Sequence, residues 1–215
     1  MFSILLRHAD FIAINKPPGI GVHQDKDSDG LTRLLAAQLG LERVWLVHRL
    51  DKPTSGILLF ALNEQAASQL AQQFAAKTIR KTYLALSDRK PSKKQGWIKG
   101  GMAKARRGAW KLTREMENPA VTQFHCMSIE TGLRLFVLQP HTGKTHQLRV
   151  AMKSIGSPIL GDSLYGGTQA ARLYLHAWQL SFDFNNQRHY ITAPLDENWP
   201  NQIQTLLIDT AYRYK

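Results

Sequence analysis

A single carboxylate lies between two bases in the segment HRLDKPTSGILLFA, residues 48–61. Asp51 follows Arg49 and precedes Lys52, and a Pro-Thr-Ser-Gly turn then leads into an apolar run with the composition of a buried strand. An acid in this place could form a structural ion pair at the turn, bind a metal, or act as a catalytic group that must stay ionised. The segment alone leaves all three interpretations open.

Apolar periodicity predicts the elements that must position this acid. Helices are expected over residues 31–40, 63–78, 145–156 and 199–209. Strands are expected within residues 3–17, 56–62, 81–87, 120–130, 132–140, 172–182 and 188–194. Strands outnumber helices and hairpins are common, so we expect an α+β fold with a mixed, mostly antiparallel sheet, flanking helices and a central catalytic cleft.

The formal charge of +12 is concentrated in one part of the chain. Residues 77–111 contain twelve Lys or Arg and a single acid, Asp88, whereas the remaining 16 bases and 15 acids nearly cancel. The same segment holds Trp97, Trp110 and Tyr83, whose rings could stack on bases. We expect this segment to bind a nucleic acid. A solvated basic face that keeps the protein in solution is the alternative.

Length and composition narrow the class of protein. At 215 residues and 43% apolar content, the chain can form one substantial domain, so we expect a single catalytic domain over residues 1–215. No stretch approaches 18 consecutive apolar residues, and the N-terminus lacks a signal-peptide pattern, which predicts a cytoplasmic protein without a membrane span. The single cysteine, Cys126, excludes an internal disulfide framework.

The segment HTGKTH, residues 141–146, contains the Gly-Lys-Thr of a phosphate-binding loop. That loop also needs a glycine five positions before the Gly-Lys pair, and this position is Leu138, so we exclude a nucleotide triphosphate site. His141 and His146 could bind a metal, but no third ligand follows at a plausible spacing. We expect neither a metal nor a cofactor.

Three segments together resemble the motifs of the RluA-type family of RNA pseudouridine synthases. They are HRLD followed by Thr-Ser-Gly, then Lys-x-Tyr-x-Ala at 81–85, and finally TGKTHQLRV at 142–150. The flanking stretches INKPPG near the start and LHAWQLSF near the end fit too, as does GDSLYG after the third motif. The resemblance covers roughly residues 4 to 195.

This chain departs from the family pattern at two positions. Lys144 stands where the family usually has Arg, and Ala151 stands where it often has His. Neither position is expected to contact the catalytic acid, so the departures bear on the substrate more than on the reaction. The motifs also begin too early to leave room for a separate N-terminal RNA-binding domain, and none is expected.

The resemblance implies a reaction and the residues that perform it. The family isomerises particular uridines in RNA by exchanging a carbon–nitrogen glycosidic bond for a carbon–carbon bond, which needs no cofactor. By this resemblance Asp51 is the essential acid, and Arg149 is the cation that keeps it ionised. An opposite charge within about 4–6 Å lowers the pKa of a carboxyl group by about 1–3 units, whereas burial raises it. Tyr83 is implied as the ring that stacks on the uracil.

The resemblance also implies a set of RNA contacts. Arg49 is expected to fill the space that the target uridine leaves when it is flipped out of its stack. Further substrate contacts are expected from motif residues Thr54, Lys81, Lys144, His146 and Gln147. The basic segment at about 89–111 is expected to form a loop or short hairpin that grips RNA phosphates, through Lys93, Lys94, Arg106 and Arg107.

Two functions from other classes stay open at this point. One is a catalytically silent RNA-binding protein of the same fold, although Asp51 and Arg149 are both intact. The other is a hydrolase of an N-glycosidic bond in nucleic acid, which would release free uracil. Ribosomal and transfer RNA are both compatible with the motifs, and a monomer is the default expectation because no hydrophobic interface is evident.

Overall fold

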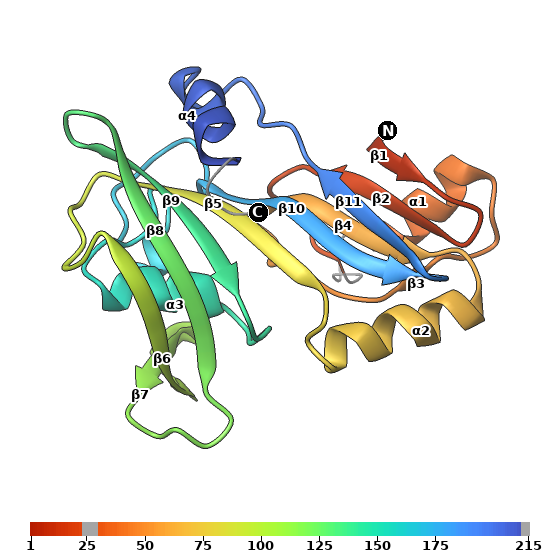
Figure 1. Cartoon of the computed structure of the whole chain (residues 1–215), viewed down its shortest axis with the longest axis horizontal. Helices are drawn as coiled ribbons and strands as arrows, with labels where there is room; N and C mark the ends of the chain where they lie inside the picture. The colour runs from red at the N-terminus through yellow and green to blue at the C-terminus, as the bar shows by residue number, and fades with distance from the viewer. Residues whose placement is uncertain (23–29, 212–215) are drawn as a thin grey trace.

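The computed structural model describes residues 1–22 and 30–211 of the chain. Within them an 11-stranded sheet follows the order β1-β2-β4-β10-β5-β9-β8-β6-β7, with β3 beside β4 and β11 beside β10 (Figure 1). The strands are β1 (Ser3–Arg7), β2 (Phe11–Lys16), β3 (Trp45–Leu46), β4 (Ser55–Ala61), β5 (Arg80–Ser87), β6 (Gln95–Lys104), β7 (Trp110–Thr113), β8 (Ala120–Glu130), β9 (Leu133–Pro140), β10 (Leu175–Phe184) and β11 (Gln187–Thr192).

The pairing is antiparallel except between β4 and β10, among the strands of the described residues. The α-helices are α1 (Leu31–Leu39), α2 (Glu64–Ala75), α3 (Gln147–Ser154) and α4 (Gln202–Ala211). Short 3-10 turns form at Arg106–Gly108 and Ser163–Tyr165. The mixed, mostly antiparallel sheet with flanking helices confirms the predicted fold class.

Local sequence signals account for the helix ends. Gly40 closes α1 in the left-handed conformation, with φ +68°, which a glycine adopts without steric cost. Asn63 caps α2, because its side-chain oxygen accepts a hydrogen bond of 2.8 Å from the Ala66 nitrogen. Both caps are the ones that the sequence pattern predicts.

The sheet buries both of its faces. In the first half, alternate residues of β4 pack against different helices: Ile57 and Leu59 belong to the core with α2, whereas Leu58 and Phe60 belong to the core with α1. The second half repeats this arrangement, with β9 packing against α3 on one face and α4 on the other. Successive residues of a strand point to opposite faces, and in β4 and β9 both sets are apolar. Each half of the sheet therefore has a helix packed on each face.

The two halves meet where β10 lies between β4 and β5 (Figure 1). The backbones of β4 and β10 approach very closely here. A Cβ added at Gly56 would lie 2.6 Å from the Ala177 nitrogen and closer still to its carbonyl oxygen, and Gly56 has a φ of +107°. Only glycine fits this position, which is one residue after the Pro-Thr-Ser segment that follows Asp51.

Candidate active site

A pocket of about 400 Å³ opens at the seam between the two halves. Its walls come from the turn before β4, from β5, from the loop after β9, and from the start of α3. Nine residues predicted from the sequence line this single pocket: Arg49, Asp51, Thr54, Lys81, Tyr83, Lys144, His146, Gln147 and Arg149. The fold thus brings together residues that are up to 100 positions apart in the sequence.

Asp51 lies on a tight turn that enters β4. The Thr54 nitrogen donates a 3.0 Å hydrogen bond to the Asp51 carbonyl oxygen, and the Asp51 side chain is 20% exposed. Because the turn precedes a strand that is buried along its whole length, the carboxylate is held at the edge of the core and still faces the pocket. This is a position where an acid can meet a substrate and avoid bulk water.

Lys16 stabilises this turn through hydrogen bonds from its buried side chain. Its side chain has no exposed surface, and the ammonium donates hydrogen bonds to the carbonyl oxygens of Lys52 at 3.1 Å, Ile20 at 3.0 Å and Pro17 at 2.9 Å. Burial, together with the nearby Arg172 charge, lowers the pKa of Lys16 to about 8, while Asp51 opposes that shift. The buried ammonium therefore connects the loop after β2 to the Asp51 turn.

Arg149 on α3 forms an ion pair with the acid. Its Nη1 atom lies 3.7 Å from Oδ2 of Asp51. Its Nε and Nη2 atoms donate two 2.8 Å hydrogen bonds to the carboxylate of Asp162, whose side chain is fully buried. Burial disfavours the charged guanidinium, but Asp162 and Asp51 outweigh it and raise the pKa of Arg149. The bidentate pair leaves one nitrogen of a fixed cation directed at Asp51.

His146, immediately before α3, is the second partner of the acid. Its Nε2 atom lies 3.9 Å from Oδ2 of Asp51, and its Nδ1 atom lies 2.8 Å from the hydroxyl of Tyr165. Burial lowers the pKa of His146, and Asp51 offsets this only in part. The imidazole is therefore neutral near pH 7 and carries a single proton.

The Tyr165 hydroxyl is the hydrogen-bond partner of His146 on the side away from Asp51. It accepts a 2.9 Å hydrogen bond from the Trp110 backbone nitrogen in β7, which leaves its own hydrogen for Nδ1 of His146. In the tautomer in which this hydroxyl donates to Nδ1, the proton of His146 resides on Nε2 and faces Asp51. The Tyr165 ring also lies under the guanidinium of Arg149, at 4.9 Å. One buried tyrosine thus contacts both partners of the acid.

Tyr83 on β5 lies between the cores of the two halves and lines the pocket. Burial, and secondarily the charge of Asp51, raises the pKa of its phenol. The hydroxyl therefore keeps its proton at neutral pH, and the ring remains an uncharged surface next to the acid. On the same strand, Lys81 donates a 3.4 Å hydrogen bond to the Thr142 carbonyl oxygen, and burial lowers its pKa.

Gln147 lines the pocket, but its amide is bonded inside the protein. Its Oε1 atom accepts hydrogen bonds from the Thr142 hydroxyl at 2.7 Å and the Lys144 nitrogen at 3.1 Å. Its Nε2 atom donates to the Val121 carbonyl oxygen and the Thr122 hydroxyl. Gln147 therefore shapes the loop that carries Lys144, with its polar atoms directed at protein groups.

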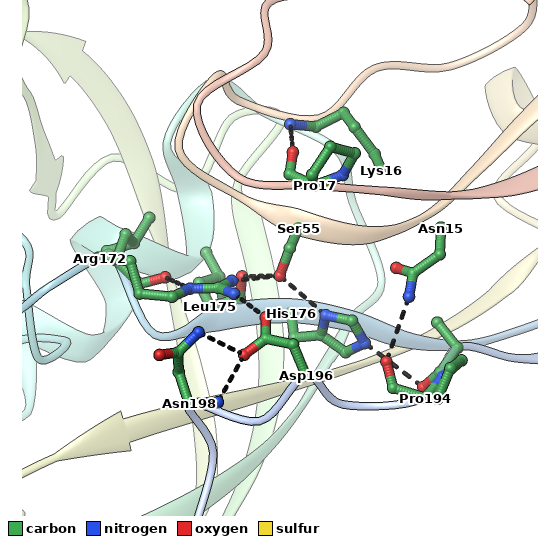
Figure 2. A network of polar contacts seen from close by, with 12 residues as sticks. Asn15, Lys16, Pro17, Ser55, Arg172, Leu175, His176, Pro194, Asp196 and Asn198 are labelled. Carbon is green, nitrogen blue, oxygen red and sulfur yellow. Dashed lines mark hydrogen bonds and ion pairs between the residues drawn. The ribbon is translucent and has the colours of Figure 1, made fainter. Parts of the chain in front are cut away.

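A buried polar network holds the start of β4 against β10 (Figure 2). The Ser55 hydroxyl lies 2.8 Å from Nδ1 of His176, which is 2% exposed, and burial lowers the pKa of His176 to about 4. Arg172 donates to both the Ser55 hydroxyl and the carboxylate of Asp196. Since Ser55 follows Thr54 directly, this network anchors the far end of the Asp51 turn.

Part of the basic segment forms a hairpin; a loop or a short hairpin is predicted from the sequence. β6 and β7 pair from Gly101 with Thr113 to Lys104 with Trp110, and they lie at one end of the sheet (Figure 1). Arg106 and Arg107 lie at its exposed tip, and Lys93 and Lys94 lie exposed before β6. These four bases are outside the seam pocket, and the Trp110–Tyr165 hydrogen bond links the hairpin to His146 in the pocket wall.

Three residues of the site are absent from the prediction: Lys16, Asp162 and Tyr165. Each stands within a stretch that supported the family resemblance, INKPPG for the first and GDSLYG for the other two. Those stretches marked the positions, but no spacing indicated that Asp162 holds Arg149 or that Tyr165 holds His146. Only the folded chain brings each of them to its partner.

Among the described residues, no helix is both long and apolar enough to cross a bilayer.

Comparison with known proteins identifies the family of this chain. A family model described as RNA pseudouridylate synthase matches residues 10–154. A Haemophilus influenzae protein named uncharacterized RNA pseudouridine synthase is 58% identical over 89% of this chain and 86% of its own. The tRNA pseudouridine synthase C of the same species is 32% identical over 93% of this chain and 95% of its own.

Solved structures agree with these sequence relatives. Human RNA Pseudouridylate Synthase Domain Containing 4 is 27% identical, with a TM-score of 0.78 over 95% of this chain and 93% of its own. Human RNA Pseudouridylate Synthase Domain Containing 1 shares the fold with a TM-score of 0.80. With motifs, pocket and relatives in agreement, the chain belongs to the RNA pseudouridine synthase family, whose members are isomerases that act on RNA without a cofactor.

Proposed function

We propose that this protein converts a specific uridine of tRNA or ribosomal RNA into pseudouridine, with Asp51 as the catalytic acid. The observation that carries the proposal is the Asp51 carboxylate in the seam pocket, 3.7 Å from a guanidinium that a second, buried carboxylate fixes in place. An isolated structural ion pair needs neither a pocket nor such a fixed partner.

The chemistry balances within the nucleotide. The bond between N1 and the sugar breaks, the uracil turns, and C5 bonds to the sugar; C5 loses a proton and N1 gains one. An ionised Asp51 can start this by attacking the sugar, by attacking the ring, or by removing a sugar proton. All three routes require the same carboxylate, and both the Arg149 guanidinium and the Nε2 proton of His146 stabilise its charge.

In this proposal Tyr83 binds the flipped uracil, and Arg49 fills the gap that the uridine leaves in its stack. The Tyr83 phenol keeps its proton, so it offers the uracil a ring for stacking and a hydroxyl that donates a hydrogen bond. Arg49 is exposed at the pocket edge, where it can occupy the gap that the uridine leaves in its stack. Thr54, Lys81, Lys144 and His146 complete the wall around the base.

The proposal also covers the domain, the cell compartment, the RNA contacts and the oligomeric state. Residues 1–215 form one catalytic domain that acts on RNA in the cytoplasm. The basic segment grips RNA phosphates, with Lys93 and Lys94 before β6 and with Arg106 and Arg107 at the hairpin tip. Because several relatives are named tRNA pseudouridine synthase C, tRNA is the first RNA class to test. The protein acts as a monomer.

The test uses unmodified tRNA and ribosomal RNA labelled with tritium at C5 of uridine, since isomerisation releases this label to water. We expect wild type to release label with an equal yield of pseudouridine, and Asp51→Asn to release none. Asp183→Asn is the matched control, because this carboxylate forms an exposed ion pair with Arg188 outside the pocket. Free uracil as product would show a hydrolase, and binding without release from either RNA pool would favour a catalytically silent RNA-binding protein.

A further inference from the structure

Trp97 is an aromatic residue of the basic segment that the catalytic pocket does not use. Its side chain is 50% exposed, although it lies on β6 within the sheet. Its backbone neighbour Ile98 is buried, so the strand turns the isoleucine into the core with α3 and the tryptophan outward. A large exposed ring on a strand is typical of a surface that binds a ligand or a macromolecule.

The ring belongs to a polar row that crosses three strands. Trp97 stands opposite Gln123 on β8, and Gln123 stands opposite Gln139 on β9. These three residues line a cavity of about 240 Å³ together with Gln95 and His125. This is less than the ~300–1,000 Å³ of pockets for drug-sized ligands, so the space suits one planar ring. Glutamine amides can donate to and accept from the edge of such a ring.

The surroundings of the ring are cationic and aromatic. The Lys99 ammonium lies over the Trp97 ring, 5.2 Å from its centre, and the His141 ring lies 4.9 Å away, tilted by 42°. Lys93 and Lys94 precede the same strand, in the segment that carries most of the net charge. The surface is therefore complementary to a polyanion that presents a flat ring, which describes a nucleotide.

The cavity and the proposed catalytic pocket are lined by neighbouring residues of one segment. His141 stands between Pro140 and Thr142, and both of these neighbours line the catalytic pocket. On the other side, Gln139 lines the Trp97 cavity. Gln139 and Pro140 are consecutive, so their side chains point to opposite faces of the sheet, and the two hollows lie on opposite faces near the end of β9. An RNA strand that passes around this end can place one base at Trp97 and, a few nucleotides away, the target uridine in the pocket.

We propose that Trp97 and His141 stack on an unpaired base of the same RNA whose uridine enters the catalytic pocket, while Gln123 and Gln139 hydrogen-bond its edge. This inference rests on the proposed function, because it assumes an RNA in the catalytic pocket. It adds a second base-binding site, and it predicts that the RNA carries a further unpaired nucleotide close to its target.

The test measures binding of a 12-nucleotide single-stranded RNA of mixed sequence, and of a duplex RNA of the same length, at several salt concentrations. Base stacking on an aromatic ring is worth about 1–3 kcal/mol, so Trp97→Leu should weaken single-strand binding about fivefold to 150-fold. Its salt slope should not change, because the substitution removes no charge. Lys99→Gln should instead flatten the slope by about 0.7.

Two variants control for unspecific effects. Tyr190→Leu removes a ring that is 78% exposed and lies beside Arg188, but on β11 in the other half of the sheet, so it should bind RNA like wild type. Trp97→Tyr keeps a ring and should retain most of the affinity. Duplex binding should be the same in all three aromatic variants and wild type, since its bases are stacked on each other.

Unchanged single-strand affinity in a folded Trp97→Leu variant would overturn the inference and would point to a partner other than RNA on this face. A loss of affinity with an altered salt slope would overturn it too, because it would indicate a general electrostatic defect. The outcome is independent of the tritium assay: a wild-type protein that binds but isomerises nothing would refute the proposed function without deciding the role of Trp97. Where target RNA is found, Trp97→Leu should raise KM and leave kcat unchanged.

Discussion

The hydroxyl of Tyr165 lies 2.8 Å from Nδ1 of His146, and its ring lies 4.9 Å from the guanidinium of Arg149. Tyr165 therefore touches both partners of Asp51 without lining the pocket itself. Through the Trp110 nitrogen it is also bonded to the hairpin proposed to hold RNA phosphates. The Tyr165 hydroxyl thus links the hairpin backbone at Trp110 to the imidazole of His146.

Tyr165→Phe removes the hydroxyl and keeps the ring against Arg149. Losing a hydrogen bond of this kind typically costs 0.5–1.5 kcal/mol, so we expect kcat to fall about two- to tenfold. The O–H group also stabilises the neutral form of His146, so without it the pKa of His146 should rise and the acid limb of the kcat profile should move to higher pH. Tyr174→Phe is the control. Identical pH profiles in Tyr165→Phe and wild type would contradict this role.

Asp162→Asn removes the charge that holds Arg149 and barely changes the volume. Breaking a buried pair from one side leaves an uncompensated charge, and we expect a loss of about 3 kcal/mol in the free energy of unfolding. Release of tritium should fall as well, because Arg149 is no longer fixed toward Asp51. Urea denaturation measures the first effect. Asp183→Asn, in an exposed pair, should change stability by less than about 1 kcal/mol.

Neutralising four bases of the basic segment tests the proposed binding of RNA phosphates. Replacing Lys93, Lys94, Arg106 and Arg107 by Gln should flatten the log–log salt dependence of tRNA binding by somewhat under one unit for each base that pairs with a phosphate. The pocket geometry should persist, so kcat at saturating RNA should change little. Arg188→Gln, on β11, serves as the control. An unchanged slope in the fourfold variant would exclude this segment as the RNA grip.

The difference in the pH dependence of stability between wild type and His176→Gln should report His176. Burial lowers its pKa in the folded protein to about 4, below the ordinary value of 6.5. Between these pH values the unfolded chain binds a proton that the folded chain does not, so the free energy of unfolding falls as the pH decreases from 6.5 to 4. The shift corresponds to at most about 3 kcal/mol. Urea titrations at about pH 7 and about pH 4.5 should show this loss in wild type and less of it in His176→Gln.

Periodicity and caps are sufficient to predict most elements of this fold. The helix after Asn63, the hairpin of β8 and β9, and the buried strand β4 are formed by local patterns, and each is predicted by its own residues. Helix α3 begins at Gln147, two residues later than predicted, because His146 adopts a left-handed conformation with φ +57°. That conformation turns its ring toward Asp51, and no periodic pattern signals it.

The partners of the site residues are harder to predict, since they depend on long-range contacts. Ser55 and His176 are 121 positions apart, and Trp110 and Tyr165 are 55 apart. Motifs mark residues that line the pocket, as with Arg149, but an acid such as Asp162 has no local feature that distinguishes it from an ordinary surface acid. Its full burial against a guanidinium is a property of the folded chain alone.

The parallel pairing of β4 with β10 has a consequence for how the protein is made. The strand that follows Asp51 waits for a neighbour that is translated more than 100 residues later, because Ser55 pairs with His176. Such long loops close slowly, and a chain emerging from the ribosome lacks this closure until β10 is available. The nascent protein therefore carries the Asp51 segment more than 100 residues before the strand that completes the seam of the pocket.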